Sequence, residues 1–445
     1  MTRPRTEAEH LASLVPASVR ATRLPRRSVL RGSVLAAGAL GGLTACGGDD
    51  AGSGGEGGGS ATTLGSNGSD EVPKKMIAAL AADAKTKAGV DVAINTIEHE
   101  KFQEGINNYL QGSPDDVWTW FSGYRMRFFA SRGLAGDISD VWQDLTGYTD
   151  AFKQAGTGDD GKQYLVPSTY GPWAVFYRKS LWQERGYTPP ADWESFKALL
   201  ARMQTDGLVP MAFADKDGWP AMGTFDQLNL RINGYQFHVD LMAGEEAWNS
   251  AEVKSVFEAW REIMPFHQEA ANGREWQEAA TALVNKEAGM MLLGSFIGEQ
   301  FPEADQGDLD FFNFPEIDPA IGADAVEAPL DGYMMSARPR DEEAAKKFLG
   351  YLGSADAGTL MVQTNPTVIT ANGDTDTSGY TELQARCAEY VGSAKSIAQF
   401  MDRDTRPDFA STVMIPSLQT FINNPADIDG LVNSIEEQKK SIFTS

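Results

Sequence analysis

Aromatic residues recur in this chain beside Gly, Pro and Asp, at positions where the pattern predicts that strands and helices end. They are Trp118, Trp120, Phe121, Tyr124, Tyr170, Trp173 and Trp219. Rigid aromatic rings offer flat faces to the axial C–H groups of a sugar, whereas its hydroxyls need fixed polar donors and acceptors. For any one ring taken alone, packing in a core is the commoner role. Their recurrence at turns favours a binding cleft for a carbohydrate.

Motifs that would indicate catalysis or metal binding are each incomplete. Residues 156–162 have the spacing of a phosphate-binding loop but lack the magnesium-binding Ser or Thr, so we expect a hairpin turn there. The zinc-protease pattern at 99–103 lacks its second His. A calcium-loop pattern at 374–379 has Ala385 in place of the bidentate Glu, and no nucleophile elbow surrounds Ser295. We therefore predict no catalytic residue, no metal site and no cofactor.

The N-terminus carries an export pattern. Arg26-Arg27 opens a twin-arginine signal, and the apolar run Ser33–Ala45 is too short and too rich in Gly and Ala to span a bilayer. Leu43–Cys46 resembles a bacterial lipobox, in which the Cys thiol is acylated and the leader is cut just before it. We predict a signal peptide at residues 1–45 and a lipid on Cys46 that anchors the mature chain to the outer face of the cell membrane.

Composition limits the possible partners. Residues 46–60 are dominated by Gly and Ser, so they are expected to form a flexible tether. The chain has a formal net charge of −24, and removal of residues 1–45, which contain seven Arg and two Glu, changes it to −29. So acidic a surface repels nucleic acids and anionic head groups, and we exclude a nucleic-acid partner. With lipid on Cys46, Cys387 has no disulfide partner and is expected to pack as a small hydrophobe.

Predicted strands alternate with predicted helices after residue 60. Strands are expected at 90–97, 117–121, 173–177, 209–212, 289–292 and 309–312. Helices are expected at 98–110, 124–132, 180–185 and 192–204, the last with Asp192 as its N-cap. Helices dominate from Asp341 onward. This alternation over about 400 residues predicts an α/β protein with two lobes rather than one sheet.

A series of motifs after residue 60 resembles, in the right order, the carbohydrate-binding family of extracellular solute-binding proteins (family 1) that serve bacterial ABC sugar importers. The matching segments are Asp115–Trp120, Phe128–Leu134, Tyr164–Pro167, Tyr177–Leu181, Pro190–Phe196, Asn285–Met290 and Ala344–Leu349 with Ser354. The resemblance implies a periplasmic-binding-protein-like fold, in which two α/β lobes close on a ligand about a hinge. It implies a first lobe of residues 61–170 with about 309–370 and a second lobe of residues 171–308 with about 371–445.

The resemblance also implies a set of ligand-binding residues in the cleft. They are Glu98, His99, Trp118, Trp120, Ser122, Tyr124, Tyr170, Trp173, Asp217, Trp219, Ser295, Phe296, Asp331, Tyr333, Asp402 and Arg403. Some positions depart from the family pattern. Phe296 stands where the family often has Trp, and Asp331 and Tyr333 stand where it often has paired glycines. Asp402 and Arg403 lie in a polar run, where an Asp–Arg pair could hold adjacent hydroxyls.

The function implied is that of a receptor, not an enzyme. A sugar favours the closed lobes because only the closed state contacts it from both sides. The closed monomer would then dock on the transmembrane subunits of an importer, which are separate chains. We expect a small hexose, although the aromatic residues would also suit an oligosaccharide. Two alternatives stay open: a secreted glycoside hydrolase that uses two carboxylates, and the same scaffold binding a peptide, a polyamine or an anion.

Overall fold

The computed structural model describes residues 61–443. They belong to a compact unit of the chain that begins at Gly59. Arg26-Arg27, Cys46 and the Gly-rich segment lie outside the described residues, so the leader, the lipid anchor and the tether stay predictions. Across residues 61–443, no helix is long and apolar enough to cross a membrane.

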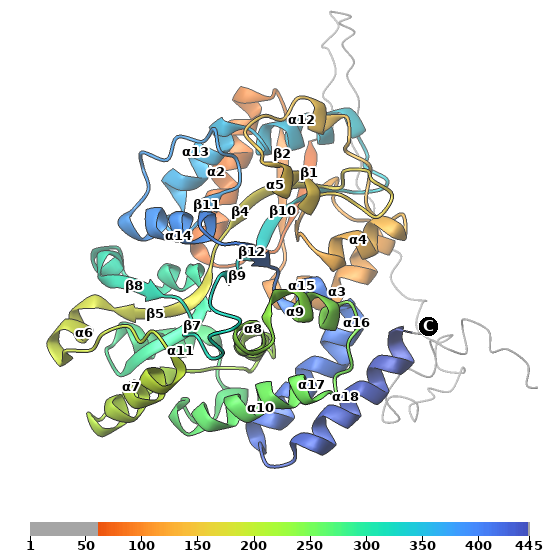
Figure 1. The fold of residues 1–445 in the computed structure, drawn as a ribbon. Helices are drawn as coiled ribbons and strands as arrows, with labels where there is room; N and C mark the ends of the chain where they lie inside the picture. Colours follow the sequence, from red (N-terminus) through yellow and green to blue (C-terminus); the bar gives the residue numbers. More distant parts are fainter. Residues whose placement is uncertain (1–60, 444–445) are drawn as a thin grey trace, which may run out of the picture. The chain divides into compact units, whose positions relative to one another are not determined.

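The first lobe is built on a six-stranded sheet with the strand order β11-β4-β10-β3-β1-β2 (Figure 1). Its strands are β1 (Thr62–Ser66), β2 (Val92–Thr96), β3 (Val117–Phe121), β4 (Leu165–Tyr170), β10 (Leu330–Met335) and β11 (Ile369–Thr370). β1 is parallel to β2 and β3, whereas β10 is antiparallel to β3 and β4. Because β1, β2 and β3 are parallel, the loops that follow them leave the same edge of the sheet.

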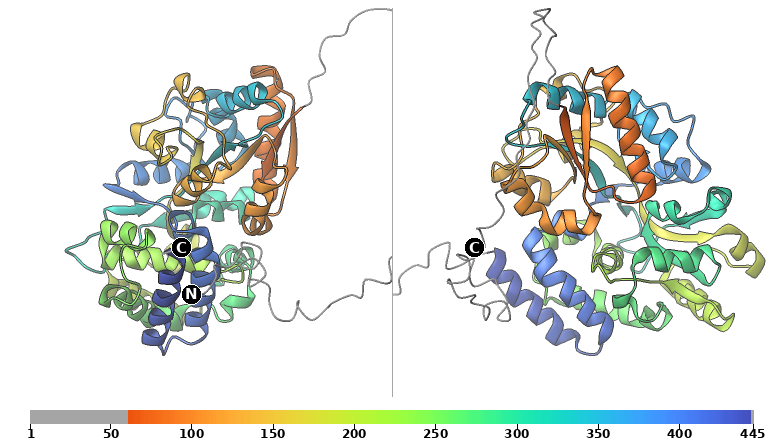
Figure 2. Two further views of the ribbon diagram at one scale, coloured as in Figure 1. Left: turned by 90° about the vertical axis from the view of Figure 1, so that its right-hand side faces the viewer. Right: turned by 180° about the vertical axis from the view of Figure 1, so that it is seen from behind.

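Helices lie on both faces of this sheet (Figure 2). They are α2 (Glu71–Lys87), α3 (His99–Gln111), α4 (Tyr124–Ser131), the 3₁₀ turn η2 (Val141–Gln143), α5 (Asp150–Ala155), α12 (Glu342–Leu352) and α13 (Ala355–Thr364). Side chains alternate between the two faces along each central strand. Leu165 and Met334 pack with α3 and α4 on one face, whereas Val166 and Tyr333 pack with α2 and α12 on the other.

The second lobe is built on a four-stranded sheet with the order β6-β7-β5-β8, and a short parallel pair, β9 and β12, lies beside it. The strands are β5 (Trp173–Arg178), β6 (Val209–Ala212), β7 (Ala288–Gly294), β8 (Leu309–Phe312), β9 (Ala325–Glu327) and β12 (Ser396–Ala398). β6 is parallel to β7, and β5 is antiparallel to β7 and β8. One continuous core joins this sheet to the helices around it.

The remaining helices are mostly those of the second lobe. They are α6 (Lys179–Arg185), α7 (Trp193–Thr205), α8 (Pro220–Ile232), α9 (Gly234–Met242), α10 (Ala251–Ile263), η3 (Met264–Phe266), η4 (Ala271–Gly273), α11 (Trp276–Val284), η5 (Ser295–Gln300), η6 (Glu303–Asp308), α14 (Glu382–Gly392), α15 (Met401–Asp404), α16 (Pro407–Phe409), the π-helical η7 (Ala410–Met414), α17 (Ile415–Asn423) and α18 (Ile428–Phe443). Cys387 of α14 is buried in the second-lobe core, as expected for a small hydrophobe.

Several local predictions are confirmed. β6 and β8 have the predicted bounds, and Asp192 caps α7 by accepting a hydrogen bond from the Ser195 amide at 2.8 Å. The segment 156–162 is a turn closed by an antiparallel bridge between Thr157 and Gln163.

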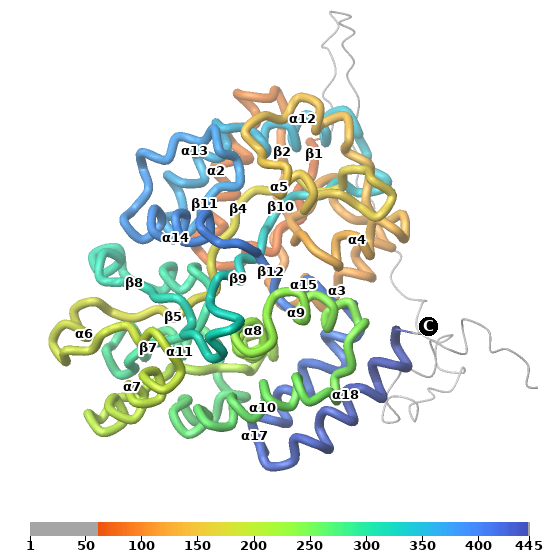
Figure 3. The backbone as a smooth tube through the Cα atoms, in the orientation of Figure 1, coloured from red at the N-terminus to blue at the C-terminus, as the bar shows by residue number. Residues whose placement is uncertain are grey.

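The predicted lobe boundary near residue 309 is wrong. β8 pairs with β5 in the second sheet, so the chain returns to the first sheet only at β10. The tube in Figure 3 shows the chain passing from β4 directly into β5 and from β9 into β10. An apolar strand such as Leu309–Phe312 suits either buried sheet, and only the pairing of the backbone decides between them.

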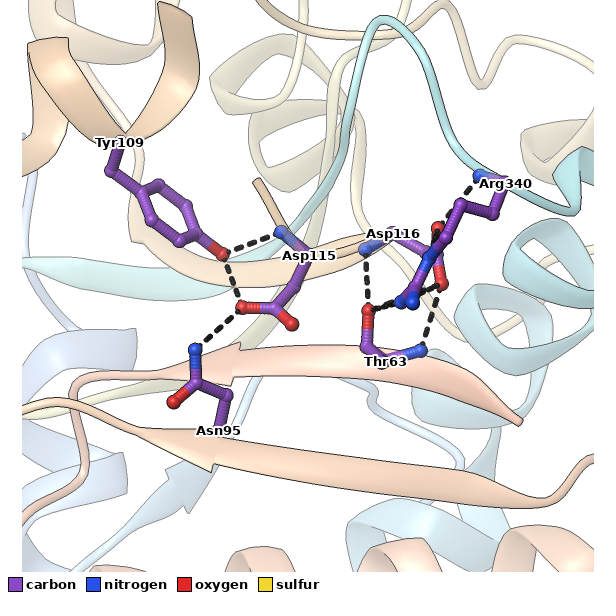
Figure 4. Close-up of polar contacts among 6 residues, drawn as sticks. All are labelled: Thr63, Asn95, Tyr109, Asp115, Asp116 and Arg340. Atoms are coloured by element: carbon purple, nitrogen blue, oxygen red, sulfur yellow. Dashed lines mark hydrogen bonds and ion pairs between the residues drawn. The ribbon is translucent and has the colours of Figure 1, made fainter. Parts of the chain in front are cut away.

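The amino ends of β1 and β3 are tied together by a buried carboxylate (Figure 4). Asp116 is 2% exposed and accepts hydrogen bonds from Thr63 N at 2.9 Å, Thr63 Oγ1 at 3.1 Å and Arg340 N at 2.7 Å. The Arg340 guanidinium also donates to it, at 2.9 Å from Nη2. Burial opposes ionisation, but the hydrogen bonds from Arg340 and Thr63 hold the pKa of Asp116 below its ordinary value. In the same view, Tyr109 and Asn95 both donate to the neighbouring Asp115.

We predict that Asp116→Asn lowers the free energy of unfolding by about 2 kcal/mol at neutral pH, because a buried acceptor is replaced in part by a donor that faces other donors. The loss should shrink as the pH falls through the lowered pKa of Asp116, where the wild-type carboxylate is itself protonated. Urea denaturation at pH 7 and pH 3 measures both effects. Asp91→Asn is the control: its side chain is 63% exposed and pairs only with Lys85, so its midpoint should match that of the wild type. Equal losses in both variants would contradict the assignment.

Candidate functional site

A cavity of about 670 Å³ lies between the two sheets. The first lobe contributes the loops after β1 and β2 and the carboxyl end of β3, which lie at the same edge of the sheet. The second lobe contributes the loop after β6, the start of α11 and the end of β7. Polar and aromatic groups that are far apart in the sequence therefore meet in one space.

Most of the sequence-predicted ligand residues line this cavity. They are Glu98, His99, Trp120, Tyr170, Trp173, Asp217, Trp219, Ser295, Phe296, Asp331, Tyr333, Asp402 and Arg403. Glu98 has a structural role as well, because its carboxylate caps α3 by accepting hydrogen bonds from the amides of Glu100 and Lys101.

Trp118, Ser122 and Tyr124 do not line the cavity. Trp118 is completely buried among the aromatic residues that join β3 to α4. The Ser122 hydroxyl donates to the backbone carbonyl of Ala155 at 2.9 Å. The ring of Tyr124 lies 6.3 Å from that of Phe128, on the same helix. All three are close to cavity residues in the sequence, but their side chains point away from the cavity and contact other residues.

Sequence reasoning missed other lining residues. Those with polar or aromatic side chains include Asn67, Asp70, Glu100, Gln103, Thr119, Lys216, Glu275, Trp276, Glu299, Asn365, Thr367 and Phe400, and Phe121, which the sequence had marked only as an aromatic residue at a strand end. Some carried a usable signal: Asn67 follows β1 directly, and Phe121 ends β3, where the carboxyl ends of parallel strands meet. Asn365 and Thr367 had none, because they lie in an irregular connection between α13 and β11.

Aromatic rings form the second-lobe wall of the cavity. Trp219 lies at ring-centre distances of 6.1 Å from Trp173, 6.1 Å from Phe296 and 6.4 Å from Trp276, each with an edge-to-face geometry. Gly223 of α8 makes this wall possible, since a Cβ there would lie 2.3 Å from Nε1 of Trp173. Phe296 therefore belongs to an aromatic wall despite replacing the expected Trp.

Charged side chains from both lobes form a second part of the cavity wall. Arg403 Nη1 lies 2.8 Å from Asp331 Oδ1, and its guanidinium lies 4.0 Å from the ring centre of Phe121. Asp402 Oδ2 accepts a hydrogen bond from Arg125 Nη1 at 3.2 Å. Asp402 and Arg403 thus each pair with a residue of the first lobe and not with each other, because consecutive residues of a helix do not face one another.

Burial shifts several ionisable groups of the cavity toward neutrality, among them His99 and Glu299. Burial, together with the nearby Arg403, lowers the pKa of His99, whose Nε2 lies 2.8 Å from Gln103 Nε2. Burial raises the pKa of Glu299 to about 7, although Asn365 and Thr367 donate hydrogen bonds to its Oε1 at 3.0 and 3.3 Å. Carboxylates still outnumber cations around the cavity.

Several buried polar atoms of the cavity residues have no protein partner. They are the indole Nε1 atoms of Trp120, Trp173 and Trp219 and the Oδ1 atom of Asp402. A buried polar group without a partner costs about 1–3 kcal/mol, so each of these residues carries an unsatisfied polar atom next to the cavity. Across residues 61–443, His, Cys, Asp and Glu form no group suited to holding a metal ion.

The loop that carries Asp217 and Trp219 is anchored by Asp215, which is completely buried. Its Oδ1 accepts a hydrogen bond from the Ala221 amide at 2.8 Å, and its Oδ2 has no partner. Burial raises the pKa of this carboxyl to about 8 against the opposing effect of the amide. The loop is therefore held by a carboxyl group that is protonated at neutral pH.

Residues 68–359 match the family model described as bacterial extracellular solute-binding protein. The match covers more than half of the chain, and the protein belongs to this family. The family predicted from the sequence is thus confirmed.

Curated relatives agree over part of their length. An uncharacterised ABC transporter extracellular-binding protein of Pyrococcus horikoshii is 22% identical over 253 residues, which are 56% of this chain and 56% of that protein. A multiple sugar-binding protein of Streptococcus mutans is 26% identical over 210 residues, 44% of this chain and 48% of that protein. The chain spans about half the length of the curated relatives it matches.

Solved structures match almost end to end. The bacterial solute receptor AcbH, described as having an exclusive substrate preference for β-D-galactopyranose, is 47% identical with a TM-score of 0.85. The match covers 86% of this chain and 99% of that one. A chitin oligosaccharide binding protein shares the fold at 21% identity, with a TM-score of 0.77 and coverage of 86% and 99%. The two-lobed fold predicted from the sequence is confirmed.

We predict that Asp215→Asn stabilises the protein increasingly as the pH rises. The pKa of Asp215 in the folded protein lies above its ordinary value in the unfolded chain. The stability that the neutral carboxyl confers is therefore complete below about pH 4 and is lost by about pH 8. Over that range the free energy of unfolding of the wild type falls by up to ~1.4 kcal/mol per pH unit. Asn keeps the acceptor for Ala221 and does not ionise. Urea denaturation of both proteins at pH 5, 7 and 8 should show a difference that widens with pH. A difference independent of pH would contradict the shifted carboxyl.

Proposed function

We propose that this protein captures a single hexose, of the β-D-galactopyranose type, between its two lobes and delivers it to an ABC importer. The observation that carries the proposal is one cavity between the lobes that is lined by both aromatic rings and hydrogen-bonding side chains. The 47% identity to a receptor described as preferring β-D-galactopyranose supports the class of sugar.

The two parts of the cavity wall suit the two kinds of surface on a pyranose. Trp219 and Phe296 offer apolar faces for C–H groups, and the carboxylates of Asp217 and Asp331 offer acceptors for hydroxyls. A sugar hydroxyl that pairs with such a group replaces water on it, so the net gain depends on how well the hydrogen bond is placed. A sugar whose hydroxyls point elsewhere leaves these groups unpaired, which is the physical basis for discriminating epimers.

No bond of the ligand needs to break. The ligand stabilises closure because Trp219 and Asp331, for example, belong to different lobes and both line the cavity. A Kd near 1 μM, about −8 kcal/mol, would combine capture with timely release. A glycoside hydrolase remains the rival function, since two of the cavity carboxylates could serve as acid and base, and it predicts cleavage products in a sugar digest.

The predicted lipid on Cys46 would keep the receptor on the outer face of the cell membrane, and the Gly-rich segment 46–60 would let it move there. The importer's transmembrane subunits would then be its protein partners, with the receptor acting as a monomer. In cells, Cys46→Ser should move the protein from the membrane fraction to the medium. Retention of the variant in the membrane fraction would contradict the anchor.

The ligand class is tested by a thermal-shift panel followed by calorimetry on the mature protein. The panel contains D-galactose, D-glucose, D-galactosamine, a trisaccharide and spermidine. We expect D-galactose to raise the melting temperature most, because a ligand at one hundred times its Kd adds about 2.7 kcal/mol to the free energy of unfolding. A shift with spermidine alone would favour the cationic alternative that the acidic cavity suggests, and a shift with the trisaccharide alone would contradict a single hexose.

We predict that Trp219→Ala raises the Kd for D-galactose at least tenfold, since a lost aromatic contact costs about 1.4 kcal/mol or more. Tyr124→Ala is the matched control. Tyr124 is also a half-buried aromatic residue that the sequence placed in the site, but it does not line the cavity, so its Kd should equal that of the wild type. Calorimetric titration of both variants measures the difference. Equal Kd values for Trp219→Ala and the wild type would remove the aromatic wall from the binding site.

A further inference from the structure

A buried arginine lies directly behind the charged wall of the cavity. Arg125, in the first turn of α4, is 6% exposed and does not line the cavity. Its Nη1 donates to Gln103 Oε1 at 2.9 Å and to Asp402 Oδ2 at 3.2 Å. Its guanidinium lies 4.8 Å from the ring centre of Trp120. Arg125 therefore touches three residues that line the cavity without reaching it.

Asp402 comes from the second lobe. The short helix that carries it, α15, is fixed to that lobe on both sides: the Met401 amide donates to Asp226 Oδ2 at 2.7 Å, and Thr405 Oγ1 donates to the Met242 carbonyl at 2.7 Å. Asp226 belongs to α8 and Met242 to α9. The contact between Arg125 and Asp402 thus joins the two lobes at the cavity.

The approach of α15 to the first lobe is unusually close. Gly123, the residue before α4, has a φ of 99°, and a Cβ there would lie 2.8 Å from the Arg403 carbonyl oxygen. Glycine alone permits both this backbone conformation and this contact. Arg403 adds its own pair with Asp331 of β10. Two pairs of opposite polarity therefore cross between α15 and the first lobe.

The two oxygens of the Asp402 carboxylate differ in their contacts. Oδ2 is held by Arg125, whereas Oδ1 is buried, has no protein partner and belongs to a residue of the cavity wall. A carboxylate held by one oxygen has a fixed orientation, so Asp402 is preorganised at the place where it lines the cavity.

We propose that Arg125 is a positioning residue for ligand binding: it holds Asp402 of the second lobe for the sugar and so links recognition to the docking of α15 on the first lobe. The inference rests on the proposed capture of a hexose. Lysine cannot replace Arg125, because one ammonium group does not provide the planar guanidinium that faces Trp120 while it bonds both Gln103 and Asp402.

The test is calorimetric titration of the mature protein with D-galactose, using Arg125→Lys and a matched control. Arg178→Lys is that control: Arg178 is also 6% exposed and bonds a carboxylate, Asp308 Oδ2, at 2.7 Å, but it lies outside the cavity. We expect Arg125→Lys to raise the Kd about tenfold, the effect of one weakened charge-assisted hydrogen bond. Arg178→Lys should lower the melting temperature and leave the Kd within about twofold of the wild type.

A double-mutant cycle separates positioning from general destabilisation. If Arg125 acts through Asp402, then Asp402→Asn should raise the Kd by a smaller factor in the Arg125→Lys background than in the wild type. Independent, multiplying factors would overturn the proposal, and so would an unchanged Kd for Arg125→Lys. Arg125→Gln provides the same comparison if the lysine variant does not fold. A wild-type protein that binds no D-galactose would overturn the proposed function, and this inference with it.

Discussion

Two very short connections hold the structure together. Gly171-Pro172 joins β4 of the first sheet to β5 of the second, and Ala328-Pro329 joins β9 to β10 in the opposite direction. Connections of this length bring the ends of the sheets to the cavity, so that Tyr170 and Trp173 both line it. The fit is tight: a Cβ on Gly171 would lie 2.2 Å from Oγ of Ser295, the first residue after β7. Every contact that a ligand makes with both lobes depends on this close approach.

The cavity residues carry two kinds of polar group. Charged groups pair with one another across the lobes, whereas a few buried atoms have no protein partner. Arg403 and Asp331, or Arg125 and Asp402, neutralise each other across the lobes, and Glu299 is neutral in part because burial raises its pKa to about 7. The indole N–H groups and Asp402 Oδ1 have no such partner. Affinity and discrimination then come from the placement of individual hydrogen-bonding groups more than from net charge.

Local sequence patterns predicted the helices, strands and turns well, but they identified only some of the residues that line the cavity. Trp118 and Trp120 lie two residues apart on β3 and point to the same face, yet only Trp120 reaches the cavity, since it stands nearer the carboxyl end of the strand. Tyr124 has the right residue type, but its ring lies along α4 beside Phe128. The roles of Gln103 and Arg125 could not be predicted from the sequence. Arg125 contacts both Gln103 and Asp402, but nothing in the local helical pattern identifies a partner as distant in the chain as Asp402.

The sequence by itself determined the alternation of strands and helices, the caps and turns, the family and the general chemistry of the site, because these depend on residue types within a few positions of one another. The tertiary structure alone decided that β8 belongs to the second sheet, which aromatic residues face the cavity, and that Asp402 and Arg403 pair across the lobes. These features depend on how strands pair and on which distant segments come into contact. The free energy of such contacts cannot be inferred from residues that are neighbours in the sequence.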